Sequence, residues 1–137
     1  MINHYSELVR AELLEDLPSL APHLTEQPDG SLFLELVSPS GSKFWLSTES
    51  DELTVGFEAH HVHFSTPWDP DPAADARDAA EYVLKLMSGQ YCIAVWSRDD
   101  KFIQSETVPK GVNPADVPRS WLGRWWLKGC SVEVRCW

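Results

Sequence analysis

The sequence lacks the long apolar runs that mark membrane proteins and secretory signals. No run approaches the roughly 18 residues that a membrane-spanning helix needs, and the apolar stretch of most interest, residues 91–96, is six residues long. The N-terminus has neither a basic flank nor a continuous apolar segment. These absences predict a soluble, cytoplasmic protein.

Cysteine is scarce, and it does not occur in pairs of short spacing. The chain has three cysteines, Cys92, Cys130 and Cys136, and no CxxC. An odd number without that spacing argues against a disulfide framework. We therefore expect free, buried thiols.

The motifs of common catalytic and nucleotide-binding sites are absent as well. The seven glycines form neither a GxGxxG nor a Walker pattern, so no phosphate-binding loop is predicted. No GxSxG elbow is present, and no cysteine has a neighbouring histidine in a family signature. The sequence predicts no enzyme of these classes and no cofactor.

Basic residues are few, with 11 Lys and Arg against 21 Asp and Glu, which gives a formal net charge of −10. Residues 1–81 hold 16 acidic and 3 basic side chains, whereas residues 82–137 hold 5 acidic and 8 basic ones. An acidic surface repels nucleic acid and anionic lipid, so we expect neither nucleic acid nor a membrane as a partner. The same surface favours a basic partner.

Apolar and aromatic side chains are plentiful, at 43% and 11% of the sequence. Burying that much apolar surface can offset the entropy lost when the chain becomes ordered. Because 137 residues suit one hydrophobic core, we expect residues 1–137 to form a single domain.

Two helices and several strands are predicted from spacing and caps. Asn3 can cap a helix over residues 3–17, and Asp71 followed by Pro72 begins another over residues 72–88. Alternation with period two predicts strands elsewhere, joined before the second helix by connections too short for parallel crossovers. These strands are residues 31–37, 43–48, 53–58, 61–65, 91–97, 101–108 and 131–136.

The pattern predicts an α+β fold in which the two main helices pack on a mostly antiparallel, curved sheet of about six to eight strands. Residues 119–127 fit either a helix or, at residues 125–127, a further strand.

His61 and His63 are the feature most suggestive of an enzyme. Residues two apart on a strand point to the same face and can bind one metal ion. Glu58, Asp69 or Asp71 could supply a third ligand, but no second motif fixes it. The simpler interpretation is a packed or exposed histidine pair without a metal.

The tryptophan-rich C-terminal end has two interpretations. Five of the seven tryptophans lie beyond residue 81, interleaved with basic residues, a composition similar to that of a nucleic-acid stacking platform. The same composition fits a core with a basic rim, and the acidic remainder of the chain argues against a polyanion.

The acidic residues gather in two places that could contact a basic protein. The helix patch, at the start and exposed side of the second helix, consists of Asp69, Asp71, Asp75, Asp78 and Glu81. The connection patch, between two strands, consists of Glu49, Asp51 and Glu52. Acids near a helix start also stabilise its dipole, so part of the helix patch has a structural explanation.

Several segments resemble a known class of proteins. They are Val-Gly-Phe at 55–57, His-Val-His-Phe at 61–64, Trp68, an alanine-rich helix ending near Ser88-Gly89, and Tyr-Cys-Ile-Ala-Val-Trp at 91–96. Over roughly residues 50–108 the chain resembles small immunity proteins of bacterial polymorphic-toxin and contact-dependent growth inhibition systems. The resemblance implies a cytoplasmic, non-enzymatic protein that binds and blocks one cognate toxin domain, and many such toxins are basic nucleases.

The leading hypothesis is therefore an immunity protein that binds a basic toxin through its acidic patches, without covalent chemistry. One alternative is a small metal-dependent hydrolase that uses His61 and His63. Another is a domain that encloses a small apolar ligand between sheet and helices, lined by Trp45, Trp96 or Trp125.

Overall fold

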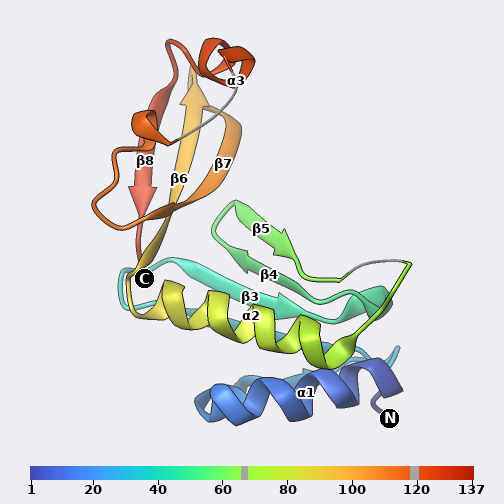
Figure 1. Cartoon of the computed structure of the whole chain (residues 1–137). Helices are drawn as coiled ribbons and strands as arrows, with labels where there is room; N and C mark the ends of the chain where they lie inside the picture. The colour runs from blue at the N-terminus through green and yellow to red at the C-terminus, as the bar shows by residue number, and fades with distance from the viewer. Residues whose placement is uncertain (66–67, 118–120) are drawn as a thin grey trace.

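The computed structural model describes residues 1–65, 68–117 and 121–137 (Figure 1). Both expected long helices are confirmed, as α1 (His4–Asp16) and α2 (Pro72–Met87). The Asn3 side chain accepts a hydrogen bond from the Ser6 backbone N–H at 2.7 Å, and Asp71 caps α2 in the same way. None of the helices within these ranges is long and apolar enough to cross a membrane.

Five strands form an antiparallel meander, as the short connections predict. They are β1 (Thr25–Glu26), β2 (Leu32–Val37), β3 (Lys43–Ser47), β4 (Thr54–Phe57) and β5 (His60–His63). Each pairs with the next along the chain, so the order in the sheet is the order in the sequence. The two-residue strand β1 is an addition to the predicted set.

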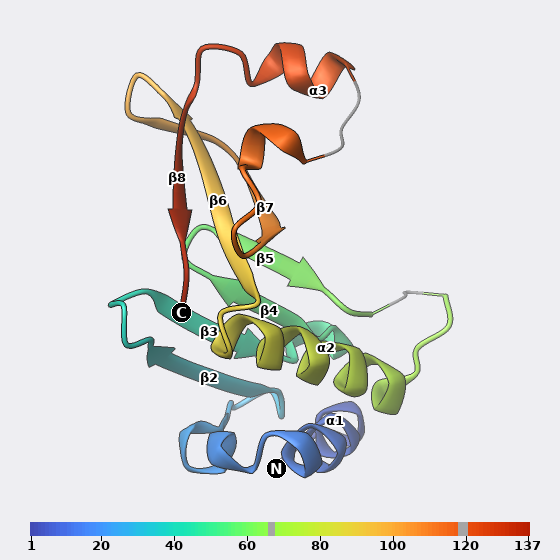
Figure 2. The same ribbon diagram turned by 60° about the vertical axis from the view of Figure 1, so that its left-hand side comes forward.

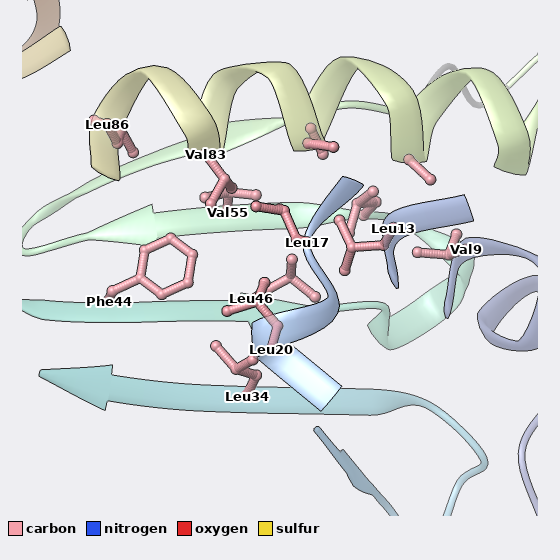
Figure 3. Packing of buried hydrophobic residues seen from close by; sticks show 14 of the residues in the cluster. Val9, Leu13, Leu17, Leu20, Leu34, Phe44, Leu46, Val55, Val83 and Leu86 are labelled. Carbon is pink, nitrogen blue, oxygen red and sulfur yellow. The ribbon is translucent and has the colours of Figure 1, made fainter. Parts of the chain in front are cut away.

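Both long helices cover the same face of this sheet (Figure 2). Alternate strand residues, among them Phe44, Leu46 and Val55, point toward the helices and are buried against Leu13 and Val83 (Figure 3). The strand period of two and the helical period of about 3.6 together bring these side chains into one core. The residues between them in sequence project from the opposite face, which neither helix covers.

The remaining strands form a second sheet. It contains β6 (Tyr91–Arg98), β7 (Lys101–Pro109) and β8 (Ser131–Arg135), with β6 in the centre. The α+β class, the antiparallel pairing and the number of strands are confirmed, and the strands divide into two sheets of five and three. Residues 125–127 are not a strand, since α3 spans Trp121–Trp126.

The contact between the two sheets is made by side chains. His60 on β5 hydrogen-bonds through Nδ1 to Ser105 at 2.8 Å and through Nε2 to Thr107 at 3.2 Å, both on β7. Burial lowers the pKa of His60, so this bridging ring is neutral at pH 7. Among the described residues no backbone ladder joins the two sheets.

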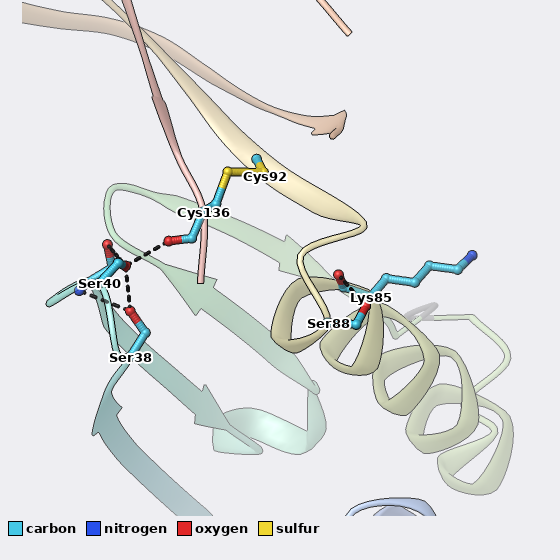
Figure 4. Close-up of a disulfide and its surroundings, with 7 residues drawn as sticks. Ser38, Ser40, Lys85, Ser88, Cys92 and Cys136 are labelled. Atoms are coloured by element: carbon cyan, nitrogen blue, oxygen red, sulfur yellow. Dashed lines mark hydrogen bonds between the residues drawn. A yellow bond between two sulfur atoms is a disulfide. The ribbon is translucent and has the colours of Figure 1, made fainter. Parts of the chain in front are cut away.

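The expectation of free thiols is wrong for two of the three cysteines. Cys92 and Cys136 form a disulfide, with Cα atoms 4.5 Å apart, and only Cys130 is free (Figure 4). The β6–β8 register pairs Ile93 with Arg135, so the cysteines are the next pair of opposite residues. Sequence spacing does not reveal this proximity, because it arises only when the two strands pair.

The residue after the disulfide returns to the first core. The Trp137 ring stacks on Phe57 with centroids 6.0 Å apart and meets Phe44 edge-on at 5.3 Å. Ser40 donates a hydrogen bond to the Cys136 carbonyl at 2.7 Å (Figure 4). The C-terminal residues therefore fasten the three-stranded sheet to the five-stranded one.

Candidate protein-binding site

A groove of about 810 Å³ lies on the face of the five-stranded sheet that the helices leave uncovered. Its floor is built from two rows of directly paired residues. One row runs from Glu35 through Trp45 and Gly56 to His61. The parallel row runs through Phe33, Ser47, Thr54 and His63. All of these residues stand on paired strands, so the strand register sets their relative positions.

The indole of Trp45 lies directly over Gly56. A Cβ atom on residue 56 would come within 2.0 Å of Trp45 Cε2, so this position of the indole requires glycine. The Trp45 and His61 rings have centroids 6.5 Å apart, and His61 meets His63 edge-on at 5.1 Å. The centre of the groove is thus a continuous aromatic surface.

Carboxylates surround this aromatic floor. Among the residues that the structure describes, four acidic side chains and one lysine line the groove. Glu35 pairs with Lys43 at 2.9 Å, while Glu58 pairs with Arg135 at 3.1 Å. The acidic lining residues are Glu35, Glu49, Glu52 and Glu58. The groove therefore favours a positively charged ligand.

The connection patch of the sequence lies at one wall of this groove. Glu49 and Asp51 belong to the short 3₁₀ helix η2 (Glu49–Asp51), and Glu49 and Glu52 line the groove. His63 Nδ1 contacts Glu52 Oε1 and lies 3.1 Å from Thr54 Oγ1. The structure thus brings together the connection patch and the histidine pair, two features that the sequence presents separately.

The surroundings of the histidine pair bear on the metal hypothesis. Among the described residues, no group of three or more His, Cys, Asp and Glu side chains could hold a metal ion. His61 instead packs beside Trp45, and the Nδ1 atom of His63 is engaged by Glu52 and Thr54. This arrangement gives the hydrolase hypothesis no support.

The helix patch is less uniform than the sequence predicts. Asp69, Asp71, Asp78 and Glu81 are exposed, but Asp71 caps α2 and Glu81 pairs with Lys85 at 2.8 Å. Asp75 was expected on the exposed side and is instead buried, with 6% of its surface accessible. It lies on the stripe of α2 that includes Ala79 and Val83, a spacing that already indicates the core-facing side.

Asp75 is held by Tyr5 of α1. The Tyr5 hydroxyl donates to Asp75 Oδ2 at 3.0 Å and also contacts the Ser65 hydroxyl at 2.7 Å. Burial raises the pKa of Asp75 above its usual range, and burial together with Asp75 raises the pKa of Tyr5 to about 12. Asp75 is thus a structural group at the α1–α2 contact.

Asp75→Asn tests this assignment through pH. The pKa of Asp75 is raised in the folded state. Its contribution to the free energy of unfolding is therefore fully present below about pH 4 and is lost as pH rises through the folded-state pKa. The amide cannot ionise, so the stability of the variant relative to wild type should rise with pH over that window. Urea unfolding between about pH 4 and 7 measures the difference. Asp78→Asn, at an exposed position of the same helix, is the control. If the difference in stability between Asp75→Asn and wild type does not change with pH, Asp75 is not the buried structural carboxyl described above.

Sequence reasoning missed most of the groove floor. Glu35 and Gly56 were not candidates, and Trp45 was expected between sheet and helices, where it does not lie. Trp96 and Trp125 do not accompany it, because they line a separate pocket in the three-stranded part. The sequence does show which residues of β2, β3 and β5 alternate with the buried ones. It does not show that these residues form one surface, because that depends on the register in which the strands pair.

Comparison with protein-family models, curated sequences and solved structures finds no match to this chain.

Proposed function

We propose that this protein is an immunity protein that binds a cognate basic toxin domain and neutralises it by occupying a functional surface of the toxin. The observation that carries the proposal is the groove on the uncovered sheet face, with its aromatic floor and four acidic lining residues. The toxin would enter this groove with a positively charged segment. Neutralisation requires only that this contact block the toxin's active site or the path of its substrate.

The groove has the properties of a protein-binding centre. Trp45 presents an aromatic face next to carboxylates, which suits an Arg or Lys side chain through cation–π attraction and ion pairing. Trp45 and Glu35 stand on the paired strands β3 and β2, so the backbone that carries them is already ordered before binding. The surrounding negative charge accelerates encounter with a basic protein.

The helix patch has a secondary role in this proposal. Asp69, Asp78 and Glu81 remain exposed and add to the negative field of the molecule, whereas the buried Asp75 is withdrawn from the contact set. Glu49 and Glu52 become the principal acidic contacts because they line the groove, and Asp51 adjoins them on η2.

A cytoplasmic location is part of the same proposal. The Cys92–Cys136 bond is the observation that weighs most against it, since disulfides persist mainly in oxidising compartments. An immunity protein that meets its toxin in the cytoplasm would carry these residues as thiols before any oxidation.

Charge reversal in the groove tests the proposal. The toxin partner to use is the C-terminal domain of a secreted protein encoded by a gene adjacent to this one. Glu49→Lys combined with Glu52→Lys is expected to weaken the complex by about 100-fold, because both carboxylates face the bound cation. Calorimetry measures affinity, and growth of cells that co-express the toxin measures protection.

A matched variant separates local contact from net charge. Glu15→Lys combined with Asp16→Lys makes the same charge change at exposed positions of α1, away from the groove. It is expected to slow association modestly and to retain protection. Equal losses from the two pairs would remove the groove from the proposal, and no complex with the neighbouring toxin would overturn the immunity function itself.

A further inference from the structure

The end of the molecule that carries α3 has an unusual concentration of exposed apolar side chains. It lies far from α1, at the top of the view in Figure 1. Leu122, Trp125 and Trp126 of α3 are 57%, 65% and 54% exposed. Phe102 at the β6–β7 hairpin and Val132 of β8 are exposed as well. Contiguous exposed apolar surface of this kind marks interaction sites.

This end is also hollowed. A pocket of about 490 Å³, here called the tip hollow, opens between α3 and the three-stranded sheet. Trp96, Trp125, Leu127 and Val132 give it apolar walls, and Trp96 and Leu127 belong to the small buried cluster beneath. A concave apolar site with a firm base accepts an inserted side chain.

The charged residues around the tip hollow are cationic. Arg124 and Lys128 line it, and none of the other described residues in its lining is charged. An adjoining depression of about 340 Å³ is lined by Arg98, Trp125, Trp126 and Lys128. Arg98 donates to the carbonyls of Trp126 and Lys128 at 3.0 and 3.1 Å, which fixes its guanidinium beside α3.

The ion pairs of the described residues leave these cations out. In the part of the chain that the structure describes, none of the ion pairs involves Arg98, Arg124 or Lys128. Ion pairing is therefore left to a ligand, in contrast to Arg135, which pairs with Glu58 and Glu133. The charged residues that line the tip hollow are thus opposite in sign to the carboxylates of the groove.

We propose that the tip hollow binds an acidic peptide segment that carries an apolar or aromatic anchor residue. The anchor inserts between Trp96, Trp125 and Leu127, while flanking carboxylates pair with Arg124 and Lys128. Buried aromatic contacts at the centre and charge pairs at the rim are the usual division of labour in such interfaces.

Two other anionic partners fit less well. A bilayer surface cannot fill a concave pocket, and a chain of net charge −10 is repelled by anionic lipid and by nucleic acid at long range. A short acidic segment meets only the local field of the tip hollow. This proposal does not depend on the immunity function, because the tip hollow and the groove share no lining residue and the cations of the one are opposite in sign to the carboxylates of the other.

Selection from a random peptide display library against the immobilised full chain tests the proposal. The expected result is a class of peptides with Asp or Glu around Leu, Phe or Trp, whose affinity falls at least tenfold in Trp125→Ala and in Lys128→Glu. The same peptides should bind the Glu49→Lys, Glu52→Lys variant normally. Circular dichroism of each variant establishes that it is folded.

Several results would overturn the proposal. One is that no selected peptide loses affinity in Trp125→Ala or Lys128→Glu. Another is that the peptides selected at this site are basic. A third is that oligothymidylate or phosphatidylcholine–phosphatidylglycerol vesicles bind the protein and that this binding requires Trp125. Self-association that Lys128→Glu abolishes, measured by light scattering, would assign the surface to a second copy of the chain. Failure of the groove in the toxin experiment would leave each of these outcomes unaffected.

Discussion

Replacing Cys92 and Cys136 together by alanine is expected to lower the free energy of unfolding by about 3–4 kcal/mol. The two residues are 44 positions apart in sequence, so their bond removes much of the freedom of the unfolded chain. The bond also holds Trp137 against Phe44 and Phe57. A loss of this size is a large share of the total stability of a small domain. Urea unfolding under oxidising conditions measures it.

The free cysteine supplies the control for that experiment. Cys130→Ala removes a half-buried thiol and no covalent bond, so it should cost much less than the double replacement. Wild-type protein in excess dithiothreitol should unfold at nearly the same urea concentration as the double variant. If the double variant instead matches Cys130→Ala, the disulfide does not stabilise the fold.

Gly56→Ala is expected to destabilise the protein by about 1–3 kcal/mol, because the new methyl group occupies the place of the Trp45 indole. The indole must then leave the floor of the groove, and its fluorescence should shift toward that of exposed tryptophan. Toxin binding should fall in parallel, because the aromatic centre of the proposed contact is lost. Denaturation and fluorescence spectra measure the first two effects.

A double-mutant cycle isolates the cause. In a Trp45→Ala background nothing opposes the added methyl group, so Gly56→Ala should become neutral or stabilising, as expected for alanine in place of glycine in a strand. A reversal of sign identifies the indole as the obstacle. Equal destabilisation in both backgrounds would mean that the backbone at residue 56, and not Trp45, requires glycine.

The local elements of the fold could be predicted because each has a signal within a few residues. Apolar spacing and the caps at Asn3 and Asp71 define α1 and α2, and alternation defines the meander of β2 to β5. The separation into two sheets has no such signal, since it depends on how β5 and β7 meet through the His60 side chain.

The candidate site required information that the sequence carries only through strand register. The connection patch and the histidine pair were both identified as candidates, but their proximity follows from the pairing of Thr54 with His63. Glu35 and Trp45 belong to the same groove because they lie directly opposite each other on the paired strands β2 and β3. The disulfide was missed for the same reason. The buried position of Asp75, by contrast, could have been read from its spacing on α2.

The position of Trp137 has a consequence for the order of folding. The meander and its two helices are made from neighbouring segments, a local topology that favours rapid formation. The Phe44 and Phe57 rings nevertheless contact Trp137, which is about 80 or more positions later in the sequence and is therefore synthesised last of the three. During synthesis on the ribosome the first core therefore assembles early but remains uncovered at one end until residue 137 emerges, and that interval is when the growing chain is most exposed to aggregation.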